Sequence, residues 1–178
     1  MKKIIIIAIF FAVSSVHAVE SRFGLGFINS ALGLPPGVNS CTSCIDLGSL
    51  DLSYLIEYDS GLAAEVGITY GVMEDDYAED PTDRVNFKIK TGYYLRGIYN
   101  FNKTFFVNAT WLDTEIGGEG LGANNQLVTN YVREGNLGYG IGANIALPNS
   151  EAAVRISYEI FDFAPGIDID QISIKYLF

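Results

Sequence analysis

Apolar and polar residues alternate along most of the chain beyond about residue 20. The clearest example is residues 64–72, AEVGITYGV, where every second position is apolar and the positions between are acidic, small or hydroxylated. Successive side chains of a β-strand point to opposite faces, so this segment would have one apolar face and one small or polar face. The pattern predicts β-strands.

Eight segments share this alternation. They lie at about 20–30, 50–59, 64–72, 84–99, 105–111, 137–145, 154–160 and 172–178. Tight turns are predicted near residues 59–61, 100–103 and 148–151, while the links at 31–46, 74–83, 116–129 and 164–168 are mostly longer and polar or glycine-rich. Short turns at one rim and long loops at the other, with an even strand number, predict an all-β, eight-stranded antiparallel up-and-down transmembrane β-barrel.

The first eighteen residues have the parts of a secretory signal peptide. Lys2 and Lys3 precede an apolar run of about ten residues, and small residues lead to Ala18. An anchoring helix is the alternative, but this run is shorter than the roughly 20 residues that span a bilayer. We therefore expect cleavage after Ala18, with residues 19–178 forming the barrel domain.

Removal of residues 1–18 changes the charge and the available chemistry. It removes two of the 11 basic residues and none of the 21 acidic ones, so the mature net charge is −12. This charge disfavours nucleic acid as a partner. His17 is also lost, and it is the single histidine of the chain. Without histidine, Ser-His-Asp, Cys-His and His-ligated metal mechanisms are excluded, so we expect no enzyme and no cofactor.

The alternation leaves two assignments of the faces. A soluble lipocalin-like barrel would bury the apolar parity, whereas a membrane barrel turns it to lipid and closes its interior with polar and small residues. The low charged content, 18%, favours lipid. Charges predicted inside, which must pair with one another, are Asp51, Glu57, Glu65, Lys88, Lys90, Arg96, Arg155, Glu159 and Lys175. Aromatic residues predicted at the two membrane interfaces are Phe23, Tyr58, Tyr70, Tyr99, Phe105, Tyr158, Tyr176 and Phe178.

The last predicted strand, ISIKYLF, ends in Tyr176-Leu177-Phe178. Together with the signal peptide and eight alternating strands, it resembles the small outer-membrane β-barrels of Gram-negative bacteria, which include OmpA-like, OmpX/Ail-like and opacity-type barrels. The resemblance covers almost the whole mature chain. It implies localisation in the outer membrane, with outer-membrane lipid and lipopolysaccharide as partners. It also implies that Phe178 and Tyr176 form the signal read by the barrel-assembly machinery.

Three segments carry candidate chemistry. Cys41 and Cys44 form a C-x-x-C in a predicted external loop, where a structural disulfide is favoured over free or redox-active thiols and over a metal site. Residues 74–83 hold six carboxylates, which predict a solvated acidic loop or, as the alternative, a divalent-cation site shared with lipopolysaccharide phosphates and extended by Asp168 and Asp170. Residues 117–122, GGEGLG, lack the strand-loop-helix context of a phosphate loop and predict a flexible outer loop.

The sequence therefore predicts a non-enzymatic outer-membrane barrel whose external loops serve surface interaction or envelope integrity. A narrow channel for small solutes and a barrel-type lipid-modifying enzyme are the alternatives. A soluble periplasmic barrel is a further alternative.

Overall fold

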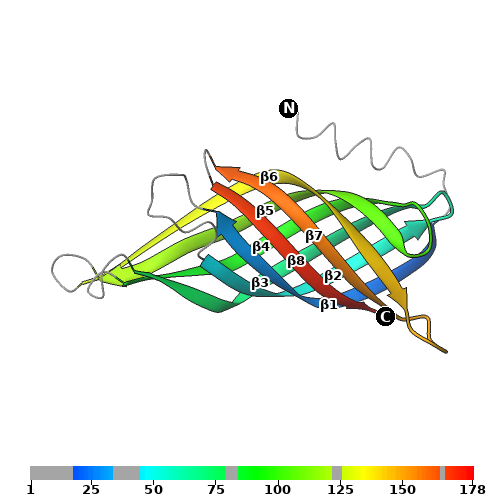
Figure 1. The fold of residues 1–178 in the computed structure, drawn as a ribbon, viewed down its shortest axis with the longest axis horizontal. Coiled ribbons are helices and arrows are strands. Elements are labelled where there is room, and N and C mark those ends of the chain that lie inside the picture. The colour runs from blue at the N-terminus through cyan, green and yellow to red at the C-terminus, as the bar shows by residue number, and fades with distance from the viewer. Residues whose placement is uncertain (1–17, 34–44, 79–83, 122–125, 165–166) are drawn as a thin grey trace.

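The computed structural model describes residues 18–33, 45–78, 84–121, 126–164 and 167–178. They form eight strands: β1 (Ala18–Gly33), β2 (Ile45–Tyr58), β3 (Leu62–Ala78), β4 (Arg84–Asn100), β5 (Phe105–Leu121), β6 (Leu127–Ala146), β7 (Ala153–Ala164) and β8 (Ile167–Leu177). Each strand pairs antiparallel with the next, and β8 pairs with β1, so the sheet closes into a barrel (Figure 1). The predicted fold class is confirmed.

Within these residues no helix has the length and apolar character needed to cross a membrane.

The last strand closes the barrel against the first. The backbone N–H of Phe178 donates to the carbonyl of Phe23 at 2.9 Å, and the N–H of Phe23 donates back to the carbonyl of Phe178 at the same distance. Their rings extend an aromatic row on the outer surface, with Tyr54 on one side at 5.1 Å from Phe23 and Tyr176 on the other at 6.0 Å from Phe178. The predicted pairing of the final strand near Phe23 is confirmed.

Three short turns lie at the same end of the barrel as the C-terminus (Figure 1). They follow Tyr58, Asn100 and Ala146, as the sequence predicts. Gly61 has φ +80° and Asn149 has φ +58°, a left-handed conformation that glycine adopts freely and asparagine tolerates. Residues that tolerate this conformation therefore allow the short connections at this end of the barrel.

The outer surface of the barrel is an apolar belt. Leu137 and Tyr139 are each 69% exposed, far more than a soluble protein would leave in one continuous band. Aromatic side chains cluster at the turn end (Tyr54, Tyr99, Phe105, Tyr176 and Phe178) and at the opposite end (Tyr70, Tyr93 and Trp111). An apolar belt between two aromatic girdles is the surface of a barrel that spans a membrane. The predicted assignment of the faces is confirmed.

Strands β3, β5 and β6 are longer than the alternation predicts, whereas β4 has the predicted bounds to within one residue. Glu74–Ala78 continue β3, Gly117–Leu121 continue β5, and β6 begins at Leu127. The predicted loops at 74–83 and 116–129 are therefore wrong in these parts, while residues 79–83 and 122–125 lie outside the described residues. Gly117 pairs with Lys88 on one side and Tyr131 on the other, so ladder hydrogen bonds on both sides override the low strand propensity of glycine.

The belt can be tested by placing a charge in it. Ile141→Arg puts a cation on the lipid-facing side of β6, 61% exposed, and is expected to lower the free energy of unfolding by about 2–4 kcal/mol. Thr129→Arg, on the exposed outer part of the same strand, is the matched control and should change it little. Unfolding by denaturant in lipid vesicles, followed by gel mobility, measures both. Equal effects of the two substitutions would contradict the assignment of the belt.

Candidate functional site

The barrel interior contains a layer of paired charges. Three acids, Asp51, Glu65 and Glu159, face three cations, Arg96, Arg155 and Lys175, and all six side chains are buried. They come from β2, β3, β4, β7 and β8. A buried charge is tolerated only when it is paired, and here equal numbers of the two signs meet. Six of the nine predicted interior charges are confirmed at this layer.

Glu65 is the centre of the layer. One carboxylate oxygen pairs with Arg96 at 2.8 Å and with Arg155 at 3.4 Å, and the other pairs with Lys175. Arg96 also pairs with Glu159 and donates to the Thr110 hydroxyl at 3.1 Å. Glu65 therefore pairs with three cations. No other carboxylate among the described residues pairs with as many.

Tyr94 connects Glu65 to the second acid. Its hydroxyl donates to Asp51 at 2.9 Å and accepts from Lys175 at 2.6 Å, and Lys175 also pairs with Asp51 at 2.6 Å. Gly67 makes room for the Tyr94 ring, because a Cβ at that position would lie 2.3 Å from Tyr94 Cζ. A glycine on the neighbouring strand is thus required for the tyrosine to lie across the interior.

Apolar side chains cover the charged layer at both ends. On the side away from the turns lie Leu32, Ile45, Leu47, Ile89, Leu112, Ile116, Phe161 and Ile169. On the turn side lie Leu55, Ala63, Ile98, Phe106 and Leu177. The prediction of an interior closed by polar and small residues was therefore incomplete. Large apolar residues exclude water from the ion pairs, and an apolar constriction also opposes the passage of ions.

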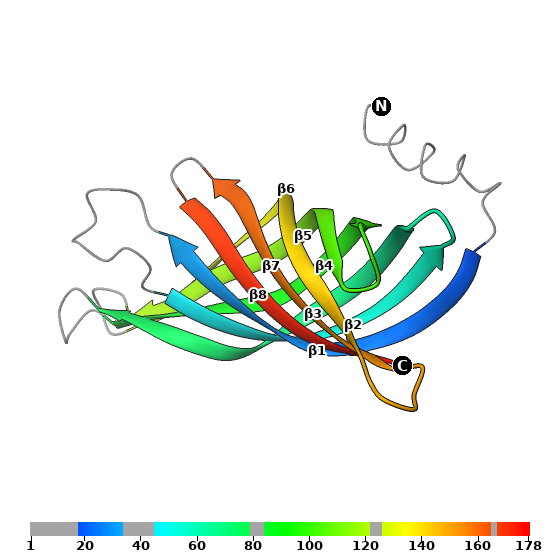
Figure 2. The ribbon, with the colours of Figure 1, turned by 45° about the vertical axis from the view of Figure 1, so that its right-hand side comes forward.

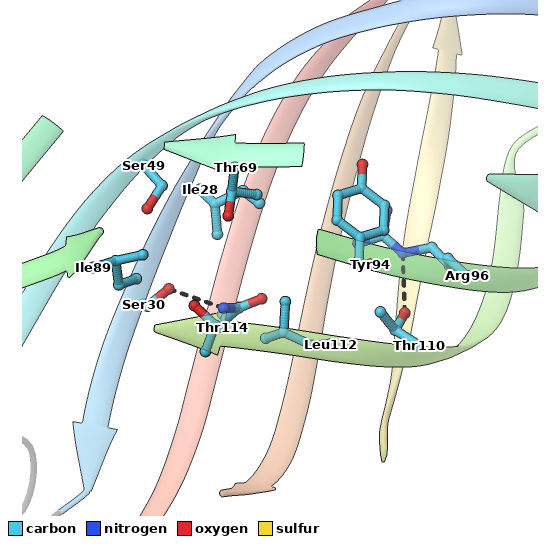
Figure 3. A pocket seen from close by; sticks show the side chains of 11 residues that line it. Ile28, Ser30, Ser49, Thr69, Ile89, Tyr94, Arg96, Thr110, Leu112 and Thr114 are labelled. Atoms are coloured by element: carbon cyan, nitrogen blue, oxygen red, sulfur yellow. Dashed lines mark hydrogen bonds between the residues drawn. The ribbon is translucent and has the colours of Figure 1, made fainter. Parts of the chain in front are cut away.

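A small cavity separates the charged layer from the larger apolar cluster. It has a volume of about 10 Å³, room for roughly one water molecule. Figure 3 shows Arg96 donating to the Thr110 hydroxyl at one side of it and Ser30 at the other. The Gln171 amide, which also lines the cavity, donates to the Ser30 hydroxyl at 3.0 Å. A cavity of this size does not admit a solute.

Glu65 offers a direct test of the charged layer. Glu65→Gln leaves three buried cations with two acids, and the free energy of unfolding should fall by about 3–5 kcal/mol. Glu119→Gln, which breaks an exposed ion pair, is the matched control and should leave the denaturation midpoint within experimental error. If both variants unfold at the wild-type midpoint, Glu65 does not hold the layer together.

Four strands continue past the apolar belt and form what we call the raised sheet: residues 74–78 of β3, 84–91 of β4, 113–121 of β5 and 127–135 of β6. In Figures 1 and 2 these ends project on the left beyond the ends of β7, β8 and β1. The β5–β6 ladder is continuous from Phe105 with Ala143 to Leu121 with Leu127. The β5–β6 part of the raised sheet is therefore continuous with the barrel wall.

Charged side chains mark where the raised sheet leaves the belt. Lys88 pairs with Glu119 at 2.8 Å, Lys90 with Glu115 at 3.2 Å, and Arg133 with Asp113 at 2.6 Å, all on the outer face. The hydrogen bond between Lys88 and Glu119 raises the pKa of the lysine and lowers the pKa of the carboxyl. Such a row of charges does not lie among acyl chains, so the membrane ends below it.

Two interior assignments are corrected here. Lys88 and Lys90 were predicted inside, but both lie on the outer face. The register of β4 against β5 shifts between Ile89 and Thr91, which adds one residue to β4. Because side chains alternate with a period of two, one extra residue exchanges the faces. Ile89 is consequently buried inside and the two lysines point outward.

The outer part of β6 has an open edge. β7 pairs with β6 only from Gly138 to Ala146, and in the part of the chain that the structure describes no strand pairs with Leu127–Gly135 on that side. The N–H of Asn144 donates to the carbonyl of Thr104, the residue just before β5, and so points to the β5 side. The β5–β6 ladder has no register shift, so even-numbered residues of β6 bond to β5. The backbone groups of Thr129, Tyr131, Arg133 and Gly135 therefore point to the open edge.

The other predicted sites are mostly untested. Cys41, Cys44 and the acidic residues 79–83 lie outside the described residues, so the disulfide stays a prediction. Asp168 and Asp170 are exposed on β8. No three His, Cys, Asp or Glu side chains of the described ranges are placed to hold a metal ion.

The signal peptide, and Phe178 with Tyr176 as an assembly signal, also stay predictions. The raised sheet itself was missed, because its glycines and carboxylates are typical of loops.

No protein-family model matches the chain, and no curated protein matches it in sequence. Solved structures do match. The crystal structure of Ail, the attachment invasion locus protein of Yersinia pestis, has a TM-score of 0.60 at 13% identity, over 89% of this chain and 97% of that one. Neisserial surface protein A has a TM-score of 0.58 at 11% identity, over 90% and 97%. Ail is also known in complex with the heparin analogue sucrose octasulfate.

The fold is that of the small eight-stranded outer-membrane β-barrels. At 11–13% identity these structures establish the architecture alone. Together with the apolar belt and its girdles, this architecture indicates an integral protein of the outer membrane, with lipid against the belt. The predicted resemblance and localisation are confirmed.

Proposed function

We propose that the protein is a non-enzymatic outer-membrane barrel that contacts other proteins at the cell surface through the open edge of β6. The observation that carries the proposal is the unpaired run Leu127–Gly135, held beyond the belt by a continuous ladder at the end of the barrel opposite the short turns. Short turns of outer-membrane barrels face the periplasm, so this end faces the outside of the cell. Exposed strand edges bind extended segments of other proteins by adding a strand, with backbone hydrogen bonds as the main contact. The name of the similar structure Ail, an attachment invasion locus protein, lends support.

Sulfated polysaccharide is a poor candidate ligand for this chain, although Ail is known with a heparin analogue. Lys88, Lys90 and Arg133, the cations of the outer face of the raised sheet whose side chains the structure describes, are each paired with an acid of the same chain. The net charge of the whole sequence is −10, which repels polyanions. Protein segments therefore fit the edge better than polyanions.

Proline at the edge tests the proposal. Thr129→Pro removes an N–H that points to the open edge and leaves the β5–β6 ladder intact, whereas Thr129→Ala keeps that N–H. Cells that display the wild type should adhere to a panel of immobilised extracellular-matrix proteins more strongly than cells that carry the empty vector. The cells are assayed at low density, as single cells. Adhesion should be lost in Thr129→Pro and kept in Thr129→Ala. Absence of wild-type adhesion, or equal adhesion of both variants, would contradict the proposed contact of this edge with other proteins.

A narrow channel makes a different prediction. The two apolar layers and the charged layer between them close the middle of the barrel, so purified protein in planar bilayers is expected to add no conductance above that of lipid alone. Reproducible single-channel steps, absent from a mock purification, would favour the channel instead.

A further inference from the structure

The open edge of β6 has a sequence that complements itself. Residues 129–135 read TNYVREG, with Val132 at the centre. Two such strands placed antiparallel around Val132 bring Val132 against Val132, Tyr131 against Arg133, Asn130 against Glu134 and Thr129 against Gly135. No like charges are directly opposite in this register. Directly opposed like charges destabilise a strand pair, so their absence favours the register.

Backbone geometry agrees with this register. The groups of Thr129, Tyr131, Arg133 and Gly135 point to the open edge, so the four pairs they form would exchange about eight backbone hydrogen bonds. The Val132 pair is then a non-hydrogen-bonded one, in which opposing side chains approach most closely. Val132 is 47% exposed and so free to make that contact.

Neighbouring registers are worse. Centring the pair on Arg133 places two guanidinium groups directly opposite each other and Glu134 against Val132. Centring it on Tyr131 places Asn130 against Val132 and Glu134 against Val128. In the Val132 register the two Arg133 side chains are diagonal neighbours, and each is already neutralised by Asp113 of its own chain at 2.6 Å.

The fixed orientation of the protein in its membrane determines where the second copy can lie. In two upright copies of one membrane the β6 strands run in the same direction, which does not allow antiparallel pairing. We infer that the open β6 edge pairs with the β6 edge of a second copy of this chain on a facing cell, in a two-fold contact centred on Val132. A single seven-residue edge binds weakly, but many copies on two surfaces act together. The inference rests on the proposed use of this edge.

Opposite charges at Val132 test the two-fold centre. Val132→Asp and Val132→Lys each place like charges face to face in a self-pair, whereas a mixed pair faces Asp with Lys. Two cell populations with truncated lipopolysaccharide, labelled with different dyes, would display these variants. Wild-type cells should cluster, each variant alone should fall to the level of vector-only cells, and the mixture should regain clusters of both colours. Val128→Asp, on the same face but outside the register, should cluster like the wild type.

Three results would overturn self-pairing: wild-type cells that do not cluster above vector-only cells, single variants that cluster like the wild type, or a mixture that stays dispersed. The difference in gel mobility between boiled and unboiled samples shows that each variant is folded, and surface labelling shows that it is displayed. The proposed function is measured separately, by adhesion of dilute single cells. If clustering fails while proline-sensitive adhesion persists, only self-pairing is wrong. If adhesion fails while the mixed variants cluster, self-pairing stands and foreign proteins are not the target.

Discussion

Backbone hydrogen bonding in lipid is the constraint on which the rest of this structure depends. No water is available in the hydrocarbon region, so every N–H and C=O of a spanning sheet must pair, and only a closed sheet achieves this. The reciprocal bonds of Phe23 and Phe178 complete that closure on one side of the barrel. Above the charged row of Lys88, Lys90 and Arg133 water is available again. There the sheet no longer has to close, and β3 to β6 continue while the other strands end.

Closure of eight strands leaves a narrow interior that must be filled. This chain fills it with polar side chains, some of them charged, between two apolar clusters. Glu65, Asp51 and Glu159 balance Arg96, Arg155 and Lys175, and glycine at position 67 makes room for the Tyr94 ring among them. The apolar clusters keep water from the pairs, which strengthens each attraction but makes loss of one partner costly. The interior is therefore specified by charge balance as well as by shape.

Much of this could be predicted from the sequence. Alternation identified all eight strands, the three turns and the face that meets lipid, because a period of two is visible without knowledge of neighbours. Glu65 and Lys175 were placed inside for the same reason, but these two residues are 110 positions apart in the sequence and their contact depends on the register of several strands. The β4 bulge at Ile89–Thr91 exchanged the faces of Lys88 and Lys90, and alternation carries no sign of such an insertion. Gly117–Leu121 resemble a loop because glycine propensity is local, whereas the ladder that orders them is not.

The orientation of the barrel in the membrane restricts the direction from which a second strand can pair with the β6 edge. An isolated β6 edge could pair with a neighbour in either direction, but insertion fixes all copies of one membrane upright. The ladder with β5 then fixes which residues offer backbone groups, since the bond of Asn144 to Thr104 sets the parity of every residue above it. Thr129, Tyr131, Arg133 and Gly135 consequently face outward together. The same hydrogen-bond alternation that satisfies β6 inside the membrane thus determines what it can bind outside it, and from which direction.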